Sequence, residues 1–178
     1  MNLPNKLTIL RIALIPVFVI FMMIQAPLYQ FLAMVVFGIA SLTDLFDGYY
    51  ARKHDMVTDF GKFMDPIADK LLVMAALVGL VAFGRVHFLA VMILLGREFI
   101  VSGMRLVIAS KGVVLAADTL GKWKTVAQMI ALVLILANGF LAWAWVNTIG
   151  QILLWISVVL SVLSCIQYIW NNREVLTK

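Results

Sequence analysis

Residues 44–69 read DLFDGYYARKHDMVTDFGKFMDPIAD, and this segment holds six of the nine acidic residues of the chain. The sequence on both sides is overwhelmingly apolar, so the clustering needs a cause. Asp44 and Asp47 stand three positions apart at the end of one apolar run. Asp65 and Asp69 stand four apart at the start of the next run. At these spacings each pair shares one face of a helix, and two helices that meet here would bring four carboxylates together.

Four carboxylates at one point indicate a metal site. Held close together they repel one another and resist ionising unless a cation lies between them. A cage of Asp oxygens suits Mg²⁺, Mn²⁺ or Ca²⁺ better than Zn²⁺. The alternative is that these are charges solvated at helix ends near a membrane surface. That alternative explains poorly why both pairs have helical spacing and why Gly48 and Gly61 lie one turn from carboxylates.

The composition indicates a membrane protein. The chain of 178 residues is 64% hydrophobic, with a mean hydropathy of +1.05. A soluble domain this apolar would expose too much apolar surface. Because a membrane span needs about 20 apolar residues, the length allows five or six spans with short loops. We therefore predict an all-α integral membrane protein in which residues 1–178 form a single transmembrane domain. The single Cys165 cannot form an internal disulfide and is expected to be a small buried hydrophobe.

Six spans are predicted from the apolar runs and their polar boundaries. They cover about residues 4–24, 28–53, 59–83 and 88–108, followed by two spans between 122 and 170 that join near 138–147. Six spans place both termini on one side. Of the fourteen Lys and Arg residues, only Arg85 falls on the other side and only Arg97 within a span. This bias predicts that the Asp-bearing side faces the cytoplasm, and it explains the net charge of +5 without nucleic acid.

The acidic segment also resembles a family signature. The pattern D-x-x-D-G-x-x-A-R, eight further residues and G-x-x-x-D-x-x-x-D is similar to that of the CDP-alcohol phosphatidyltransferases, integral membrane enzymes of phospholipid synthesis. The matching positions are Asp44, Asp47, Gly48, Ala51, Arg52, Gly61, Asp65 and Asp69. The segments PNKLTILR, GKFMDPIADKLL, GREFIVSGMR and LGKWKTVAQ extend the resemblance over most of the chain, closest to the bacterial members that use glycerol 3-phosphate.

The resemblance implies a reaction and its residues. An alcohol hydroxyl attacks the phosphate of CDP-diacylglycerol that bears the diacylglycerol, and CMP leaves. Asp44, Asp47 and Asp65 would hold two divalent ions, Mg²⁺ or Mn²⁺, with Asp69 near the second ion and acting as the base. The residues implied at the CDP-diacylglycerol are Asn5, Thr8, Gly48, Ala51, Arg52, Thr58 and Gly61. For Asn5 and Thr8 the alternative is helix capping, with Lys6 and Arg11 snorkelling to the membrane surface.

An acceptor such as sn-glycerol 3-phosphate needs cations for its phosphate. The candidates are Arg105, Lys122, Lys124 and Arg97. The positive-inside bias accounts equally well for the two lysines, and a structural ion pair accounts for Arg97 beside Glu98. The resemblance further implies a homodimer in the bacterial cytoplasmic membrane, with the active site facing the cytoplasm.

Two other functions stay open at this point. One is a related phosphatidyltransferase with another acceptor: serine, inositol phosphate or phosphatidylglycerol. The other is a small divalent-cation transporter, for which an acidic cluster within the membrane is also expected. A transporter needs acidic residues accessible from both sides, yet the turns expected on the opposite side, near 25–28 and 84–87, contain no Asp or Glu.

Overall fold

The structure is a computed structural model that describes residues 3–53, 59–110 and 119–177, with side chains for residues 8–43, 64, 67–108 and 119–173. Within these ranges the chain forms helices and no strand. The helices are α1 (Leu3–Met23), α2 (Pro27–Lys53), α3 (Asp59–Ala82), α4 (Phe88–Ser110), α5 (Thr119–Leu141) and α6 (Ala144–Thr177). The all-helical class and the order of six helices agree with the sequence prediction. The last helix extends beyond the expected span and through the polar tail.

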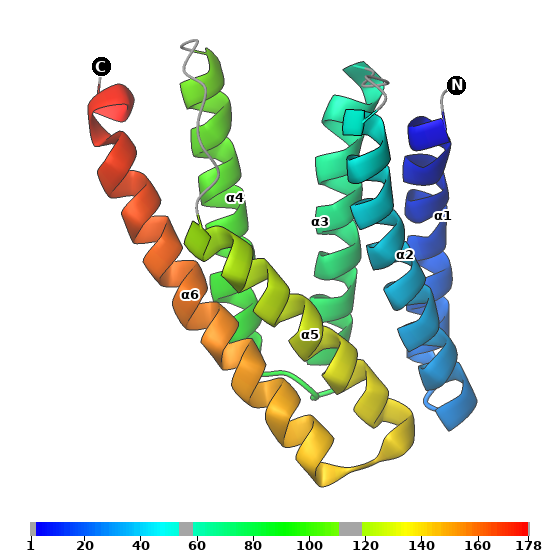
Figure 1. Cartoon of the computed structure of the whole chain (residues 1–178). Helices are drawn as coiled ribbons and strands as arrows, with labels where there is room; N and C mark the ends of the chain where they lie inside the picture. The colour runs from blue at the N-terminus through cyan, green and yellow to red at the C-terminus, as the bar shows by residue number, and fades with distance from the viewer. Residues whose placement is uncertain (1–2, 54–58, 111–118, 178) are drawn as a thin grey trace.

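The helices form two groups joined by α5 (Figure 1). In the first group α1 packs against both α2 and α3, and in the second α4 packs against α6. Helix α5 runs along α6 and also contacts α2. One apolar cluster connects these elements, with Phe18, Phe37, Leu77, Leu132 and Leu154 at its buried centre. Gly150 allows the tight contact between α5 and α6, because a Cβ there would lie 2.8 Å from Ile135 Cγ1.

The described ends of the chain lie at the same end of the bundle (Figure 1). The last turn of α2, the first turn of α3 and the last turn of α4 lie there too. The backbone therefore agrees with the prediction that the two Asp-bearing helix ends meet on the side of the termini. Pro66 lies inside α3, which begins at Asp59.

The outer surface of the bundle is apolar. Leu106, Trp170 and Phe99 are more than 60% exposed, at 71%, 66% and 65%. Two stretches, Thr119–Leu141 and Ala144–Arg173, are long and apolar enough to cross a membrane, and Thr8–Met23 and Pro27–Thr43 are shorter apolar helices. Continuous apolar surface of this kind suits contact with acyl chains.

Exposed tryptophans occur near both ends of the bundle. Trp143 and Trp145 stack with ring centroids 5.7 Å apart where α5 joins α6. At the other end the guanidinium of Arg173 lies 4.6 Å from the ring centroid of Trp170. Amphipathic rings at two levels are typical of the aromatic belts that lie at the two membrane interfaces.

The end of the bundle opposite the termini is held together by Arg85. Its guanidinium donates to Gln30 Oε1 (2.7 Å) and Gln25 Oε1 (3.0 Å), and its carbonyl accepts from Gln151 Nε2 (2.6 Å). Gly139 lets this guanidinium approach α5, since an added Cβ would lie 2.5 Å from Arg85 Nη1. The one cation expected on the far side therefore joins the α1–α2 and α3–α4 connections to α5 and α6.

Candidate functional site

Helix α1 fixes the last turns of α2 through a buried cation. Arg11 and Thr8 are each 1% exposed. Arg11 Nε donates to the Ala40 carbonyl (3.2 Å), and Thr43 Oγ1 donates to the same carbonyl (2.8 Å). Arg11 therefore does not snorkel to a membrane surface, and Thr8 lies inside α1 rather than at its cap. These bonds lie one turn before Asp44 and set the direction in which the acidic end of α2 leaves the core.

The predicted acidic positions lie in helical backbone. Asp44 and Asp47 lie near the end of α2, and Asp65 and Asp69 lie early in α3. The helical spacing assumed from the sequence therefore holds for both pairs. Only Asp69 has a described side chain. Among the other predicted residues of the metal and lipid-donor sites, only the backbone is described for Asn5, Asp44, Asp47, Gly48, Ala51, Arg52, Gly61 and Asp65, and Thr58 lies outside the described residues altogether.

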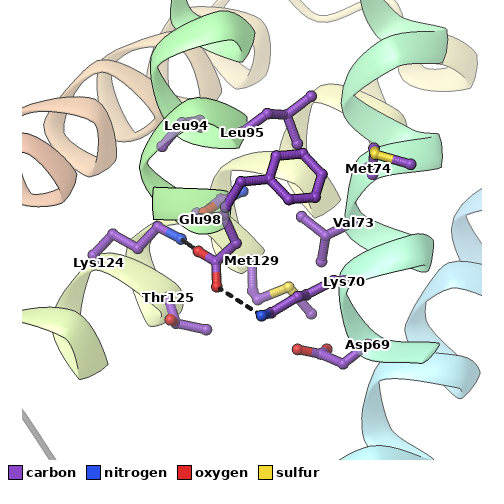
Figure 2. Close-up of a pocket in the computed structure, with 12 residues that line it drawn as sticks. Asp69, Lys70, Val73, Met74, Leu94, Leu95, Glu98, Lys124, Thr125 and Met129 are labelled. Atoms are coloured by element: carbon purple, nitrogen blue, oxygen red, sulfur yellow. Dashed lines mark hydrogen bonds and ion pairs between the residues drawn. The ribbon is translucent and has the colours of Figure 1, made fainter. Parts of the chain in front are cut away.

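Asp69 stands between two hollows of different character. The first, called the polar cavity, has a volume of about 80 Å³ and lies between α3, α4 and α5 (Figure 2). Its polar lining consists of Asp69, Lys70, Glu98, Lys124, Thr125 and Gln128. The second, called the apolar groove, has a volume of about 560 Å³ and lies along α2 and α5. Asp69 lines it together with apolar side chains such as Phe37, Leu42 and Ile130. Asp69 is half-buried.

Glu98 connects three cations at the polar cavity. Its Oε2 lies 2.9 Å from Lys124 Nζ and 3.4 Å from Arg97 Nη1, and its Oε1 lies 4.0 Å from Lys70 Nζ. Figure 2 shows Lys124 and Lys70 reaching Glu98 from opposite sides, with Asp69 beneath Lys70. Three cations around one carboxylate leave an excess of positive charge, and such a place attracts an anion.

The surrounding helices hold these cations in position. Arg97 Nη2 donates to Ser164 Oγ on α6 (2.8 Å), and Lys70 donates to Ser102 Oγ on α4. The side chains of Lys124 and Arg97 are only 6% and 12% exposed. Buried cations with fixed partners lose little conformational entropy when they bind a ligand.

The four predicted acceptor cations divide into two sets. Lys124 and Arg97 belong to the Glu98 network. Lys122 is exposed, and Arg105 lies on the α6 side, with its guanidinium 6.0 Å from the ring centroid of Tyr168. Of the four, Lys124 alone is among the described residues that line the polar cavity.

Most of the chain is similar to a known family of proteins. The family model of the CDP-alcohol phosphatidyltransferases matches residues 1–163. The chain belongs to this family. Proteins named CDP-diacylglycerol–glycerol-3-phosphate 3-phosphatidyltransferase are similar to it over nearly their whole length. That of Bacillus subtilis is 44% identical, covering 98% of this chain and 97% of the relative. Those of Rickettsia bellii and Haemophilus influenzae are 44% and 41% identical, covering 94% of this chain and 93% and 91% of the relatives.

The metal site expected of a CDP-alcohol phosphatidyltransferase falls mostly on side chains that are not described. Among the side chains described, only Asp69 and Glu98 are acidic, and no group of three or more possible ligands occurs there. What the structure contributes is the helical backbone of both Asp pairs and the position of the end of α2 and the start of α3 at the same end of the bundle (Figure 1). Carboxylate oxygens from two helices are a donor set that fits a hard divalent ion.

Four polar residues of the site were not predicted from the sequence as ligand-binding positions: Lys70, Glu98, Thr125 and Gln128. Lys70 carried one signal, because it directly follows Asp69. Gln128 carried another, because it lies one helical turn after Lys124 and therefore on the same face of α5. Glu98 was considered only together with Arg97, as part of a structural ion pair with other helices. No local pattern indicates that it also contacts cations of α3 and α5.

Proposed function

We propose that this chain transfers the phosphatidyl group of CDP-diacylglycerol to sn-glycerol 3-phosphate, giving phosphatidylglycerophosphate and CMP. The supporting observation is the position of Asp69, which lines both the polar cavity and the apolar groove. A carboxylate at this junction can meet a small phosphorylated alcohol on one side and a lipid on the other. The names of the relatives state the same donor and acceptor.

The apolar groove suits the lipid donor. Phe37, Leu42 and Ile130 give it an apolar wall, and Ile130 and Leu42 are about half exposed on the outer surface, at 48% and 55%. An acyl chain could therefore enter from the membrane. The nucleotide end would lie toward the Asp-bearing helix ends, where Gly48 permits close approach to the backbone of α2. Arg52 and Thr58 would contact the nucleotide or its phosphates, with Asn5, Thr8, Ala51 and Gly61 nearby.

The polar cavity suits a small phosphorylated acceptor. A single water needs about 10–15 Å³ of such volume, so about 80 Å³ holds a few waters or one small polyol phosphate. Phosphatidylglycerol, with two acyl chains, does not fit there. Serine has no phosphate to match the excess positive charge. Lys124 lines the cavity and would bind the acceptor phosphate by a charge-assisted hydrogen bond, taking it in place of Glu98. Arg97, which contacts Glu98 from outside the lining, would add positive charge.

Asp69 is the base in the proposed reaction. Its carboxylate takes the proton of the acceptor's primary hydroxyl. The oxygen then forms a bond to the phosphorus that bears the diacylglycerol, and the bond from that phosphorus to the oxygen of the CMP phosphate breaks. CMP leaves with the electron pair. Two divalent ions, Mg²⁺ or Mn²⁺, held by Asp44, Asp47, Asp65 and Asp69, would neutralise the pyrophosphate and the developing charge on the leaving group.

The setting of the reaction is also part of the proposal. All six helices cross the bacterial cytoplasmic membrane, with both termini and the Asp-bearing helix ends on the cytoplasmic side. The positive-inside bias of the Lys and Arg residues supports this orientation. The protein is a homodimer by resemblance to its family alone, and native mass spectrometry in detergent would test this.

An acceptor panel tests the function. The purified protein in detergent is mixed with CDP-diacylglycerol, Mg²⁺ and one of four alcohols: sn-glycerol 3-phosphate, serine, inositol 1-phosphate or phosphatidylglycerol. CMP release and the lipid product are measured. We expect product only with sn-glycerol 3-phosphate, no product after EDTA, and recovery with Mg²⁺ or Mn²⁺. Transfer to another alcohol would show that this chain is a phosphatidyltransferase that uses that acceptor. Metal uptake into liposomes without CMP release would identify a transporter.

A further inference from the structure

We propose that Gln128 binds the middle hydroxyl of the acceptor's glycerol backbone and thereby determines which phosphorylated alcohol is used. This inference rests on the proposed function and specifies one part of it. Gln128 lies on α5, is 4% exposed and lines the polar cavity.

The amide of Gln128 differs from those of the buried Gln30 and the half-buried Gln151. It makes no hydrogen bond with any residue that the structure describes. By contrast, Gln30 Nε2 donates to the Met22 carbonyl (3.0 Å) and its Oε1 accepts from Arg85 (2.7 Å). Gln151 Nε2 donates to the Arg85 carbonyl (2.6 Å). Although Gln128 as a residue is 4% exposed, its amide atoms are not among the fully buried polar atoms that lack a partner, so they are open to the cavity. An amide in this position is expected to find its partner in what the cavity binds.

The position of Gln128 matches the chemistry of the acceptor. Lys124 and Gln128 lie one turn apart on the same face of α5, and both are buried. Asp69 reaches the same cavity from α3. In glycerol 3-phosphate the phosphate, the middle hydroxyl and the reacting hydroxyl stand on consecutive carbons. With the phosphate at Lys124 and the reacting hydroxyl at Asp69, the middle hydroxyl lies between them within the cavity that Gln128 lines. A glutamine amide can both donate to and accept from a hydroxyl.

The test compares two acceptors that differ only in this hydroxyl. They are sn-glycerol 3-phosphate and 3-hydroxypropyl phosphate, which keeps the phosphate and the reacting hydroxyl. The variant is Gln128→Met, which keeps the length of the side chain but loses the amide. Gln151→Met is the matched control, because it makes the same exchange far from the cavity. The measured quantity is the ratio of kcat/KM for the two acceptors in full-length protein with saturating CDP-diacylglycerol.

We expect the wild type and Gln151→Met to prefer glycerol 3-phosphate by at least about tenfold, because a site built to bond a hydroxyl rejects the analogue that lacks it. In Gln128→Met the preference should fall to within about threefold, through loss of activity with glycerol 3-phosphate, while the KM for CDP-diacylglycerol stays unchanged. Gln128→Glu retains an acceptor for the hydroxyl and should recover part of the preference. If Gln128→Met does not fold, the ratio of kcat/KM for the two acceptors is measured in Gln128→Glu instead.

The outcomes separate the two proposals. If the wild type uses glycerol 3-phosphate but Gln128→Met keeps the wild-type ratio, the role of Gln128 is overturned and the function stands. The role of Gln128 is also overturned, and the function also stands, if the wild type uses both acceptors equally well. If the wild type forms no product from either phosphorylated acceptor, the proposed function itself fails.

Discussion

Replacing Lys124 by Met tests the phosphate site most directly. Lys124 Nζ lies 2.9 Å from Glu98 Oε2, and its side chain is 6% exposed. A hydrogen bond to a charged group contributes about 1.5–3 kcal/mol, so losing one to the acceptor phosphate should lower kcat/KM for glycerol 3-phosphate by about 10–150-fold. Arg97 and Lys70 remain near Glu98, at 3.4 and 4.0 Å, so the carboxylate keeps cationic neighbours in the variant.

Lys122→Met is the matched control for this experiment. Lys122 lies two positions away on the same helix, is exposed, and is not among the described residues that line the polar cavity. CMP release is measured while glycerol 3-phosphate and CDP-diacylglycerol are varied in turn. We expect Lys124→Met to raise the KM for glycerol 3-phosphate with little change in the KM for CDP-diacylglycerol, and Lys122→Met to change either by less than about threefold. Equal effects of the two substitutions, or an effect confined to the lipid donor, would refute the placement of the phosphate at Lys124.

Three further predictions concern the proposed base Asp69, the close contact at Gly139 and the backbone strain at Ala142. Asp69→Asn should lower kcat by about 10²–10⁴-fold, with the thermal unfolding temperature retained; unchanged turnover would exclude Asp69 as the base. Gly139→Ala should destabilise the protein by about 1–3 kcal/mol, because its Cβ would lie 2.5 Å from Arg85 Nη1, whereas nothing lies within 4 Å of a Cβ at Gly103. Equal unfolding temperatures for Gly139→Ala and Gly103→Ala would contradict this. Ala142 has a φ of 52°, so Ala142→Gly should raise the unfolding temperature; a lower one would show that this backbone is not strained.

Sequence reasoning predicted the fold class and most helix boundaries because these depend on local patterns. Apolar runs ended by Pro, Gly and charged residues gave six helices in the correct order, with ends within a few residues of those observed. It was less successful with buried cations. Snorkelling of Arg11 to a membrane surface was one of two alternatives, yet Arg11 bonds to the Ala40 carbonyl inside the bundle. A polar side chain in a terminal turn looks the same in sequence whether it faces lipid headgroups or another helix.

The sequence by itself determined that this protein is helical and apolar, that it carries two Asp pairs at helical spacing, and that it belongs with the CDP-alcohol phosphatidyltransferases. Only the tertiary structure decided which cations gather around Glu98, and that Asp69 faces both a polar cavity and an apolar groove. The physical reason is distance along the chain. Lys70, Glu98 and Lys124 lie on three different helices, and the packing of α3, α4 and α5 brings their charges together where no local pattern could.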